Sequence, residues 1–408
     1  MAGPLTLLFD RPTLGIVQAG NQKTERRSGG LDTLRGGAVL AVLAWHCLNN
    51  TSVLRTPALS FLQEFSSHFF FGVDLFFVLS GFLIGGALMA SRDAKDYFSR
   101  YAARRIGRIF PLYFAWLAAF GLLSWLGAQR LGGAFPWLLG LDGMPYWSFL
   151  TFTQNFYSAE LGTWGPMWLG VTWTLAIEVH FYVLAAILVY LVPLRWMGPV
   201  SLAIIAAAFV LQIYGWPSRG WEEITVLTPL RLDAPFAGVF CAWLWRAPAT
   251  RELIGRHALM FKCAALALVA GAYVSVVYGN LRDPDANFTA NALIFGLATL
   301  AFAAPDTGSP SWPVRFMRWC GIRCYGLYIF HVGILGLASH LIFTSPPNAL
   351  PPGMGWPAVA VGLAITFGLA AVSWRYFERP IMRWAARFKA QRGSVGSFMS
   401  RPSVSRLR

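Results

Sequence analysis

The chain has 408 residues, of which 56% are apolar and only 12% charged, and its mean hydropathy is +0.52. This composition excludes an ordinary soluble domain and predicts an integral membrane protein. The net charge of +15 would also suit a nucleic-acid-binding protein, but the basic residues gather in alternate loops, a pattern typical of membrane topology.

Apolar stretches of about twenty residues, enough to cross a hydrocarbon core of about 30 Å, recur along the whole chain. We predict an all-α integral membrane protein with about ten transmembrane helices in a single bundle, at residues 33–50, 69–90, 109–128, 168–192, 198–214, 229–246, 258–279, 288–304, 324–344 and 356–377. The segment 129–167, rich in Gly, Trp, Phe and Pro, could instead re-enter the membrane or lie on its surface, which would allow eleven helices.

The basic residues predict the orientation of these helices. They precede the first, third, seventh and ninth spans and follow the tenth, as at Lys23, Arg100, Arg256, Arg315 and Arg387. By the positive-inside rule, both termini are then cytoplasmic. We therefore expect a cytoplasmic N-terminal tail at 1–30, one membrane domain at 31–385, and a disordered basic cytoplasmic tail at 386–408.

The second span carries two glycines four residues apart, Gly81 and Gly85, on one face of the predicted helix. In membrane helices this spacing lets a neighbouring helix approach closely. It predicts tight packing and carries no chemistry of its own.

Ionisable groups at membrane depth are costly, at about 2.5–3.5 kcal/mol each even on a lenient scale, and so need an explanation. They are His46, Asp74, Glu178, His180, Asp233 and His331. His46 lies roughly 18 Å beyond the inner start of its span, at about 1.5 Å per residue. Its imidazole could hydrogen bond to a neighbouring helix or act as a general base. Glu178 could join two helices by an ion pair with an arginine or could be a functional acid. A histidine such as His331, considered by itself, is more often structural.

A second group of charges begins two of the spans. Arg35 starts the first, and the third starts with Arg104, Arg105 and Arg108, just before Pro111, which suits a first helical turn. Arginines bind phosphate or carboxylate with two parallel hydrogen bonds, so this cluster could hold an anionic cosubstrate. Arginines at a membrane edge more often reach to lipid headgroups and set the topology.

Seven motifs follow one another along the chain: LDTLRG followed by His46, GVDLFFVLSGFLI at 72–84, RRIGRIFPLY at 104–113, WTLAIEVHFY at 173–182, RLDAPFAGVFCAW at 231–243, YGLYIFHVGI at 325–334 and YFERP at 376–380. In this order they resemble the motifs of the acyltransferase 3 family of membrane O-acyltransferases. The resemblance implies a catalytic His46, and Arg35, Arg105 and Arg108 at the site of an acyl-CoA donor. It also implies importance for Asp32, Asp74 and Glu178. Departures at Thr33, Thr174 and Gly333 remove no titratable group.

From this resemblance we expect a multi-pass protein of the bacterial inner (plasma) membrane. It would transfer a short acyl group, acetyl or succinyl, from acyl-CoA (acetyl-CoA) to a hydroxyl of a polysaccharide, glycolipid or other sugar-containing or lipid acceptor. His46 would deprotonate that hydroxyl, steadied by Glu178 or Asp74. No metal is expected, because the sequence has no HExxH motif and no compact carboxylate cluster. The alternative is a non-enzymatic transporter or flippase of glycolipid or polysaccharide, which would also need interior charges.

Overall fold

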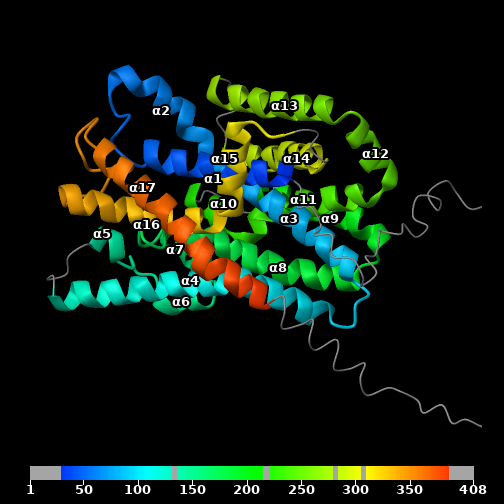
Figure 1. Ribbon diagram of the computed structural model, residues 1–408, viewed down its shortest axis with the longest axis horizontal. Coiled ribbons are helices and arrows are strands. Elements are labelled where there is room, and N and C mark those ends of the chain that lie inside the picture. Colours follow the sequence, from blue (N-terminus) through cyan, green and yellow to red (C-terminus); the bar gives the residue numbers. More distant parts are fainter. Residues whose placement is uncertain (1–28, 131–135, 215–220, 279–283, 305–308, 386–408) are drawn as a thin grey trace, which may run out of the picture.

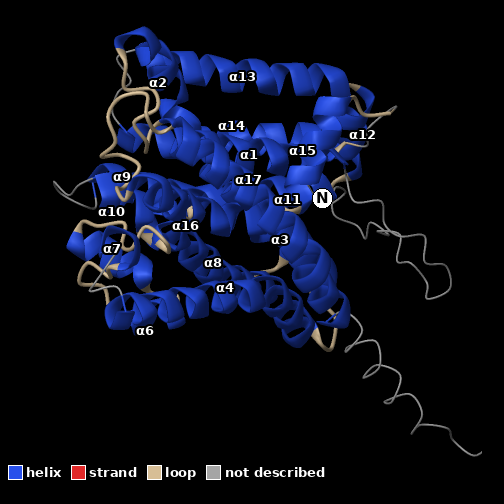
Figure 2. Cartoon of the chain, turned by 60° about the vertical axis from the view of Figure 1, so that its left-hand side comes forward, coloured by secondary structure: helices blue, strands red, loops and turns tan. Residues whose placement is uncertain are grey.

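The computed structural model describes residues 29–130, 136–214, 221–278, 284–304 and 309–385, and within these ranges it contains helices and no strand (Figure 2). The predicted all-α class is therefore confirmed. Residues 1–28 of the predicted N-terminal tail and all of the predicted C-terminal tail lie outside the described residues. The helices are α1 (Gly29–Leu48), α2 (Ser60–Ser66), α3 (Gly72–Ser91), α4 (Tyr97–Arg130), α5 (Pro136–Leu139), α6 (Tyr146–Leu150), α7 (Gln154–Leu161), α8 (Trp173–Leu191), α9 (Met197–Tyr214), α10 (Trp221–Val226), α11 (Asp233–Arg246), α12 (Pro248–Arg256), α13 (Ala258–Tyr278), α14 (Pro284–Ala303), α15 (Trp312–Ile322), α16 (Cys324–Phe343) and α17 (Trp356–Ser373).

Seven helical stretches in the described ranges are long and apolar enough to cross a membrane, and the bent pair α12 and α13, with an angle of 85°, would make eight. All ten predicted segments form helix, but α11 has only 14 residues, or about 21 Å, less than the core of about 30 Å. The count of ten thus stays a prediction. The seven stretches are Gly29–Leu48, Pro57–Ser91, Tyr97–Gly127, Gly170–Leu191, Leu194–Tyr214, Cys324–Phe343 and Trp356–Ala385.

The ambiguous segment 129–167 forms three short helices, α5, α6 and α7, with residues 131–135 outside the described part. The longest of them, α7, has 8 residues, far fewer than the roughly twenty needed to span a bilayer. The segment instead packs beside α4 and α8 through α5 and α7. None of its described helices is therefore long enough to be an eleventh span.

The long helices form a bundle whose outer members are α13 along one side and α4 along the other (Figures 1 and 2). Between them lie α1, α3, α8, α11 and α16, which carry all the candidate site residues singled out from the sequence except the arginines of α4. Helix α3 is central, because it packs against α1, α8, α11 and α14. Chemistry-bearing side chains from distant parts of the sequence can therefore meet around α3.

Close packing of α3 against α11 depends on glycine. A Cβ atom added at Gly81 would lie 1.8 Å from the carbonyl oxygen of Pro235, and one at Gly238 would lie 2.0 Å from that of Val78. No side chain fits at such distances, so the backbones touch directly. The tight packing predicted from Gly81 and Gly85 is confirmed at α11, with Val239 in van der Waals contact at Gly85.

Helix α4 begins at Tyr97, twelve residues before the predicted start at 109, and runs for 34 residues, or about 50 Å. Arg105 and Arg108 therefore lie inside a continuous helix and not just before it. Pro111 also lies inside this helix, so its placement in a first helical turn was wrong. The extra length exceeds the membrane core of about 30 Å, so one end must extend beyond it.

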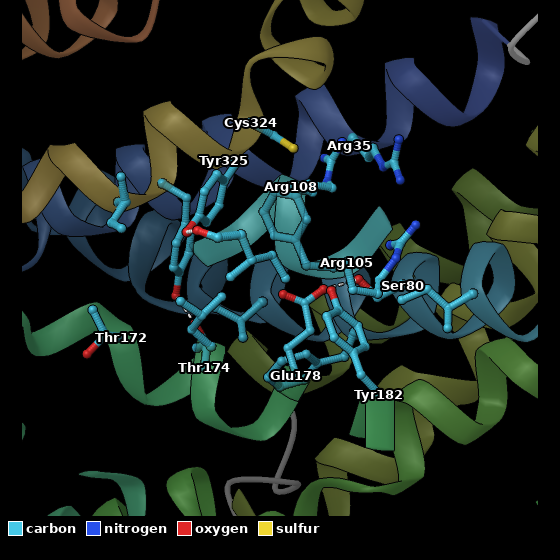
Figure 3. Close-up of a pocket in the computed structure, with 18 of the residues that line it drawn as sticks. Arg35, Ser80, Arg105, Arg108, Thr172, Thr174, Glu178, Tyr182, Cys324 and Tyr325 are labelled. Atoms are coloured by element: carbon cyan, nitrogen blue, oxygen red, sulfur yellow. Dashed lines mark hydrogen bonds between the residues drawn. The ribbon is translucent and has the colours of Figure 1, made fainter. Parts of the chain in front are cut away.

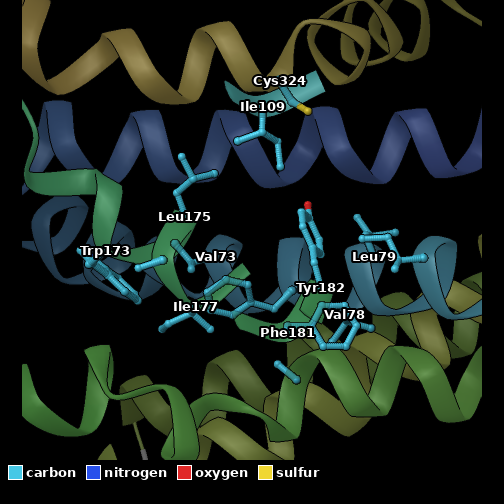
Figure 4. Packing of buried hydrophobic residues seen from close by; sticks show 14 of the residues in the cluster. Val73, Val78, Leu79, Ile109, Trp173, Leu175, Ile177, Phe181, Tyr182 and Cys324 are labelled. Atoms are coloured by element: carbon cyan, nitrogen blue, oxygen red, sulfur yellow. The ribbon is translucent and has the colours of Figure 1, made fainter. Parts of the chain in front are cut away.

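Apolar side chains fill the space between α3 and α8. Val73, Val78 and Leu79 of α3 pack with Ile177 and Phe181 of α8, all buried (Figure 4). This packing fixes the spacing of two helices that both contribute polar residues to the cavities described next. The polar groups are thus held by a rigid apolar frame.

Candidate active site

The three predicted donor-binding arginines line one cavity. Arg35 of α1 and Arg105 and Arg108 of α4 converge there with Glu178 of α8, and Figure 3 shows these side chains around the same space. The cavity, which we call the arginine cavity, holds about 910 Å³ of space free of atoms, counting its open mouth. Only about 100 Å³ of it is open to the centre of a water-sized sphere, so the cavity is narrow between its side chains.

Glu178 is held from the neighbouring helix. The hydroxyl of Ser80 in α3 donates a hydrogen bond of 2.6 Å to Oε1 of Glu178, drawn as a dashed line in Figure 3. One turn further along α8, the ring of Tyr182 lies 5.8 Å from the guanidinium carbon of Arg105. The cavity therefore combines three cations with one anchored carboxylate.

Asp32 lies outside this lining. It is buried in the first turn of α1, and its carboxylate pairs with the guanidinium of Arg35 at 3.4 Å, one turn away. Its place in the structure suits the orientation of Arg35 more than direct contact with a donor in the arginine cavity.

His46 lies in the last turn of α1, eleven residues or about 16 Å from Arg35 along the same helix. It lines a second cavity, which we call the histidine cavity, with about 1,680 Å³ of free space, again counting the mouth. Seven aromatic side chains and three amides also line it: Trp45, Phe70, Trp137, Trp164, Trp173, Phe288, Tyr328, Asn49, Asn50 and Asn348. Two of the tryptophans come from the segment 129–167.

The imidazole of His46 has two close polar neighbours, besides the edge-on ring of Trp45 at 4.7 Å between centroids. The amide nitrogen of Asn50, just past the end of α1, donates to Nδ1 of His46 at 3.1 Å. The ring of His331 in α16 lies edge-on, with 4.8 Å between the two ring centroids. Neither neighbour is a carboxylate, which is the partner that the sequence led us to expect.

Asp74 has a different partner. Its carboxylate forms a fully buried ion pair with Arg231, whose guanidinium also lies 3.7 Å from the centroid of the Phe288 ring. Both Asp74 and Arg231 line the histidine cavity. The structure thus places Asp74 near His46 but pairs its charge with an arginine.

The remaining interior groups are used in packing. Oδ2 of Asp233 accepts hydrogen bonds from the Gln212 amide at 3.0 Å and the Thr289 hydroxyl at 2.8 Å. Nδ1 of His180 is 2.8 Å from the hydroxyl of Thr228. Neither group lines the arginine or the histidine cavity.

The two cavities share a wall. Val73, Val171 and Tyr328 line both of them. The hydroxyl of Tyr328 accepts a hydrogen bond of 3.0 Å from Thr174, which lines the arginine cavity. The three arginines 35, 105 and 108 and the imidazole of His46 therefore line two adjoining cavities.

Sequence reasoning passed over three polar residues at these cavities: Arg231, Asn50 and Tyr328. Arg231 could have been found, because it is an arginine within the predicted span 229–246 and so carries the cost of any intramembrane charge. Asn50 and Tyr328 carry no such signal. Their roles follow only from what they touch.

The chain is similar in sequence to several known or putative O-acetyltransferases. Peptidoglycan O-acetyltransferase OatA of Listeria monocytogenes is 25% identical over 381 residues, covering 86% of this chain and 55% of that protein. YrhL of Bacillus subtilis is 26% identical over 377 residues, covering 86% of this chain and 54% of that protein. The chain thus spans about half the length of these two relatives. No solved structure matches it.

A family model also matches, and its description is an acyltransferase domain. The match runs over residues 28–375, and so covers α1 to α17 and every residue that lines the two cavities. The chain therefore belongs to the acyltransferase 3 family.

Proposed function

We propose that this chain is a membrane O-acyltransferase that moves a short acyl group, acetyl or succinyl, from acyl-CoA to a hydroxyl of a polysaccharide, glycolipid or other sugar-containing acceptor. One observation carries the proposal: a cavity lined by three arginines and a cavity lined by His46 share the wall formed by Val73, Val171 and Tyr328. A donor and an acceptor held in these cavities would meet at that wall.

The arginine cavity suits the donor. Coenzyme A carries several phosphates, and guanidinium groups bind phosphate with paired hydrogen bonds. Arg35, Arg105 and Arg108 supply three such groups from two helices. Glu178 reduces the net charge of the cavity and, with Ser80, gives it a fixed polar wall.

The histidine cavity suits a sugar. The tryptophan rings at 45, 137, 164 and 173 offer flat apolar faces for the C–H groups of a pyranose, and the amides of Asn49, Asn50 and Asn348 can bond to its hydroxyls. The similarity to OatA, a peptidoglycan O-acetyltransferase, supports a glycan acceptor.

In the reaction the acceptor oxygen attacks the thioester carbonyl. The C–O bond forms as the C–S bond breaks, and the proton of the hydroxyl passes to the imidazole of His46 and from there to the leaving thiolate. A hydroxyl is too weakly acidic to attack unaided, so a positioned base contributes about 10²–10⁴ in rate.

The proposal includes the orientation. The arginine cavity would open to the cytoplasm, where acyl-CoA is made, because the basic loops that include Arg92, Lys95 and Arg100 lie at the start of the same helix α4. Both termini would then be cytoplasmic and the membrane would be the bacterial inner membrane.

The test uses the full-length protein in proteoliposomes, with acetyl-CoA labelled in the acetyl group and a hexamer of N-acetylglucosamine as the probe acceptor. We expect labelled ester on the sugar with wild type and a loss of at least about a hundredfold with His46→Gln. His257→Gln is the matched control, because His257 is exposed at the end of α12. Its rate should equal that of wild type.

Two outcomes would contradict the proposal. If His46→Gln transfers acetyl as fast as wild type, His46 is not the base. If wild type consumes neither acetyl-CoA nor succinyl-CoA but moves a fluorescent glycolipid across the bilayer, the chain is a transporter.

A further inference from the structure

A second histidine lies beside the proposed base. His331, in the second turn of α16, is 3% exposed, and its ring lies 4.8 Å from that of His46 between centroids. Buried polar groups are normally hydrogen-bonded, so the partner of each ring nitrogen of His331 has to be identified.

The backbone determines where the proton of His331 sits. Nδ1 of His331 lies 2.6 Å from the carbonyl oxygen of Tyr328, and since a carbonyl only accepts, Nδ1 carries the hydrogen. In the neutral ring Nε2 is then a lone-pair acceptor. This buried atom has no hydrogen-bond partner among the described residues.

The tautomer of His46 is complementary. The Asn50 amide nitrogen donates to Nδ1 of His46, which places the hydrogen of the neutral ring on Nε2. One ring therefore offers an N–H, and the ring next to it offers an unused lone pair. At a centroid distance of 4.8 Å, a rotation of the His46 side chain can bring the two within hydrogen-bond reach, about 3 Å.

The carboxylates that could have filled this role are engaged elsewhere. Asp74 is paired with Arg231, and Glu178 accepts from Ser80 on the far side of the shared wall. Many His-based sites have a carboxylate beside the base, and here an imidazole lies beside His46.

From these contacts we infer that His331 is the positioning residue of His46. Its neutral Nε2 accepts the Nε2–H of His46, orients that ring, and stabilises the imidazolium that forms when Nδ1 of His46 takes the proton of the acceptor hydroxyl. Asn50 occupies the place of that hydroxyl until the acceptor displaces it. The inference rests on the proposed function, because it assumes that His46 is the base.

Two substitutions separate this role from a packing role. His331→Gln keeps an acceptor oxygen near the position of Nε2, whereas His331→Asn keeps an N–H for the Tyr328 carbonyl and removes that acceptor. A positioning role predicts near-normal acetyl transfer, within about threefold, for His331→Gln. It predicts a loss of about tenfold to a hundredfold for His331→Asn, the worth of one hydrogen bond to a charged group.

A role limited to the Tyr328 hydrogen bond predicts the reverse order, with His331→Asn active and His331→Gln impaired. Either that order or equal activity of the two variants would overturn the inference. The KM for acetyl-CoA should be unchanged in both, since His331 does not line the arginine cavity.

A second measurement does not depend on the reaction. The full-length protein in detergent, labelled with ¹⁵N-histidine, reports the tautomer of each of its 6 histidines through the ring nitrogen shifts. The measurement uses Asn50→Ala throughout, which removes the donor at Nδ1 of His46. On this background we expect His46 to carry its hydrogen on Nε2 with His331 intact and with His331→Gln, and to show a mixture of tautomers with His331→Asn. An unchanged His46 in all three would refute the pairing. If wild type transfers no acetyl group, the proposed function fails, and this measurement still decides whether the two rings are coupled.

Discussion

The buried ion pair between Asp74 and Arg231 makes a prediction that separates a structural role of Asp74 from a catalytic one. Arg231→Met removes one partner and leaves a carboxylate that is 1% exposed without a counter-charge. Loss of one member of a buried pair costs about 3–5 kcal/mol. Adding Asp74→Asn removes the stranded charge and leaves only an amide with unmet hydrogen bonds, about 1–3 kcal/mol. The double variant should therefore be more stable than Arg231→Met alone.

Unfolding can be followed by the reaction of a thiol-specific fluorophore in detergent, because four cysteines are buried: Cys47, Cys241, Cys320 and Cys324. The exposed Cys263 is replaced by serine throughout to remove the background. Arg256→Met is the control, since the pair of Arg256 with Glu252 is more than two-thirds exposed and should cost less than about 1 kcal/mol.

The reasoning is refuted if the double variant melts at or below the Tm of Arg231→Met. Acetyl transfer by the same proteins tests the role of Asp74 in chemistry. If Asp74 only neutralises Arg231, Asp74→Asn alone should lose activity because it leaves the arginine without a counter-charge. The double variant should then regain most of that activity. If Asp74 steadies His46 directly, the double variant should stay as inactive as the single one.

Two further predictions concern α3 and α4. Gly81→Leu should lower the yield of folded protein and its Tm, at a cost of about 3 kcal/mol or more, because the added Cβ would lie 1.8 Å from the carbonyl oxygen of Pro235. Gly37→Leu is the control and should leave the Tm unchanged, because nothing lies within 4 Å of a Cβ added there. Equal Tm values for the two variants would contradict the packing argument. Arg108→Lys should raise the KM for acetyl-CoA about tenfold, because lysine cannot form paired hydrogen bonds to phosphate. Arg104→Lys is the control and should leave the KM unchanged, because Arg104 is exposed and lies outside the cavity. Equal KM values for the two variants would show that Arg108 is not part of the donor site.

Much of the fold could be predicted from the sequence because the lipid environment allows few backbone conformations. A backbone in hydrocarbon must satisfy its hydrogen bonds within the segment, so an apolar stretch such as 324–344 has to be helical. The family could also be identified from the sequence, since its motifs lie in order from Leu31 to Pro380, and the family match confirms it.

Helix ends were read less well. Hydropathy stops at the arginines of 104–108, but the helix does not, because alanine and arginine are good helix formers and α4 continues back to Tyr97. The span predicted at 229–246 loses its first residues to a short 3-10 turn at Thr228–Arg231, which has Pro229 in its first turn. The start of α4 was thus predicted too late and the start of α11 too early.

The sequence by itself determined which residues are candidates for the chemistry: cost arguments and motifs singled out His46, Glu178 and the arginines 35, 105 and 108. Only the tertiary structure decided which of them meet. It gathers the three arginines and Glu178 in one cavity, and it gives His46 an imidazole and an amide as neighbours in place of a carboxylate. Pairings between distant segments depend on how the helices cross, and that is set by contacts such as Gly81 against Pro235, which no local pattern of residues specifies.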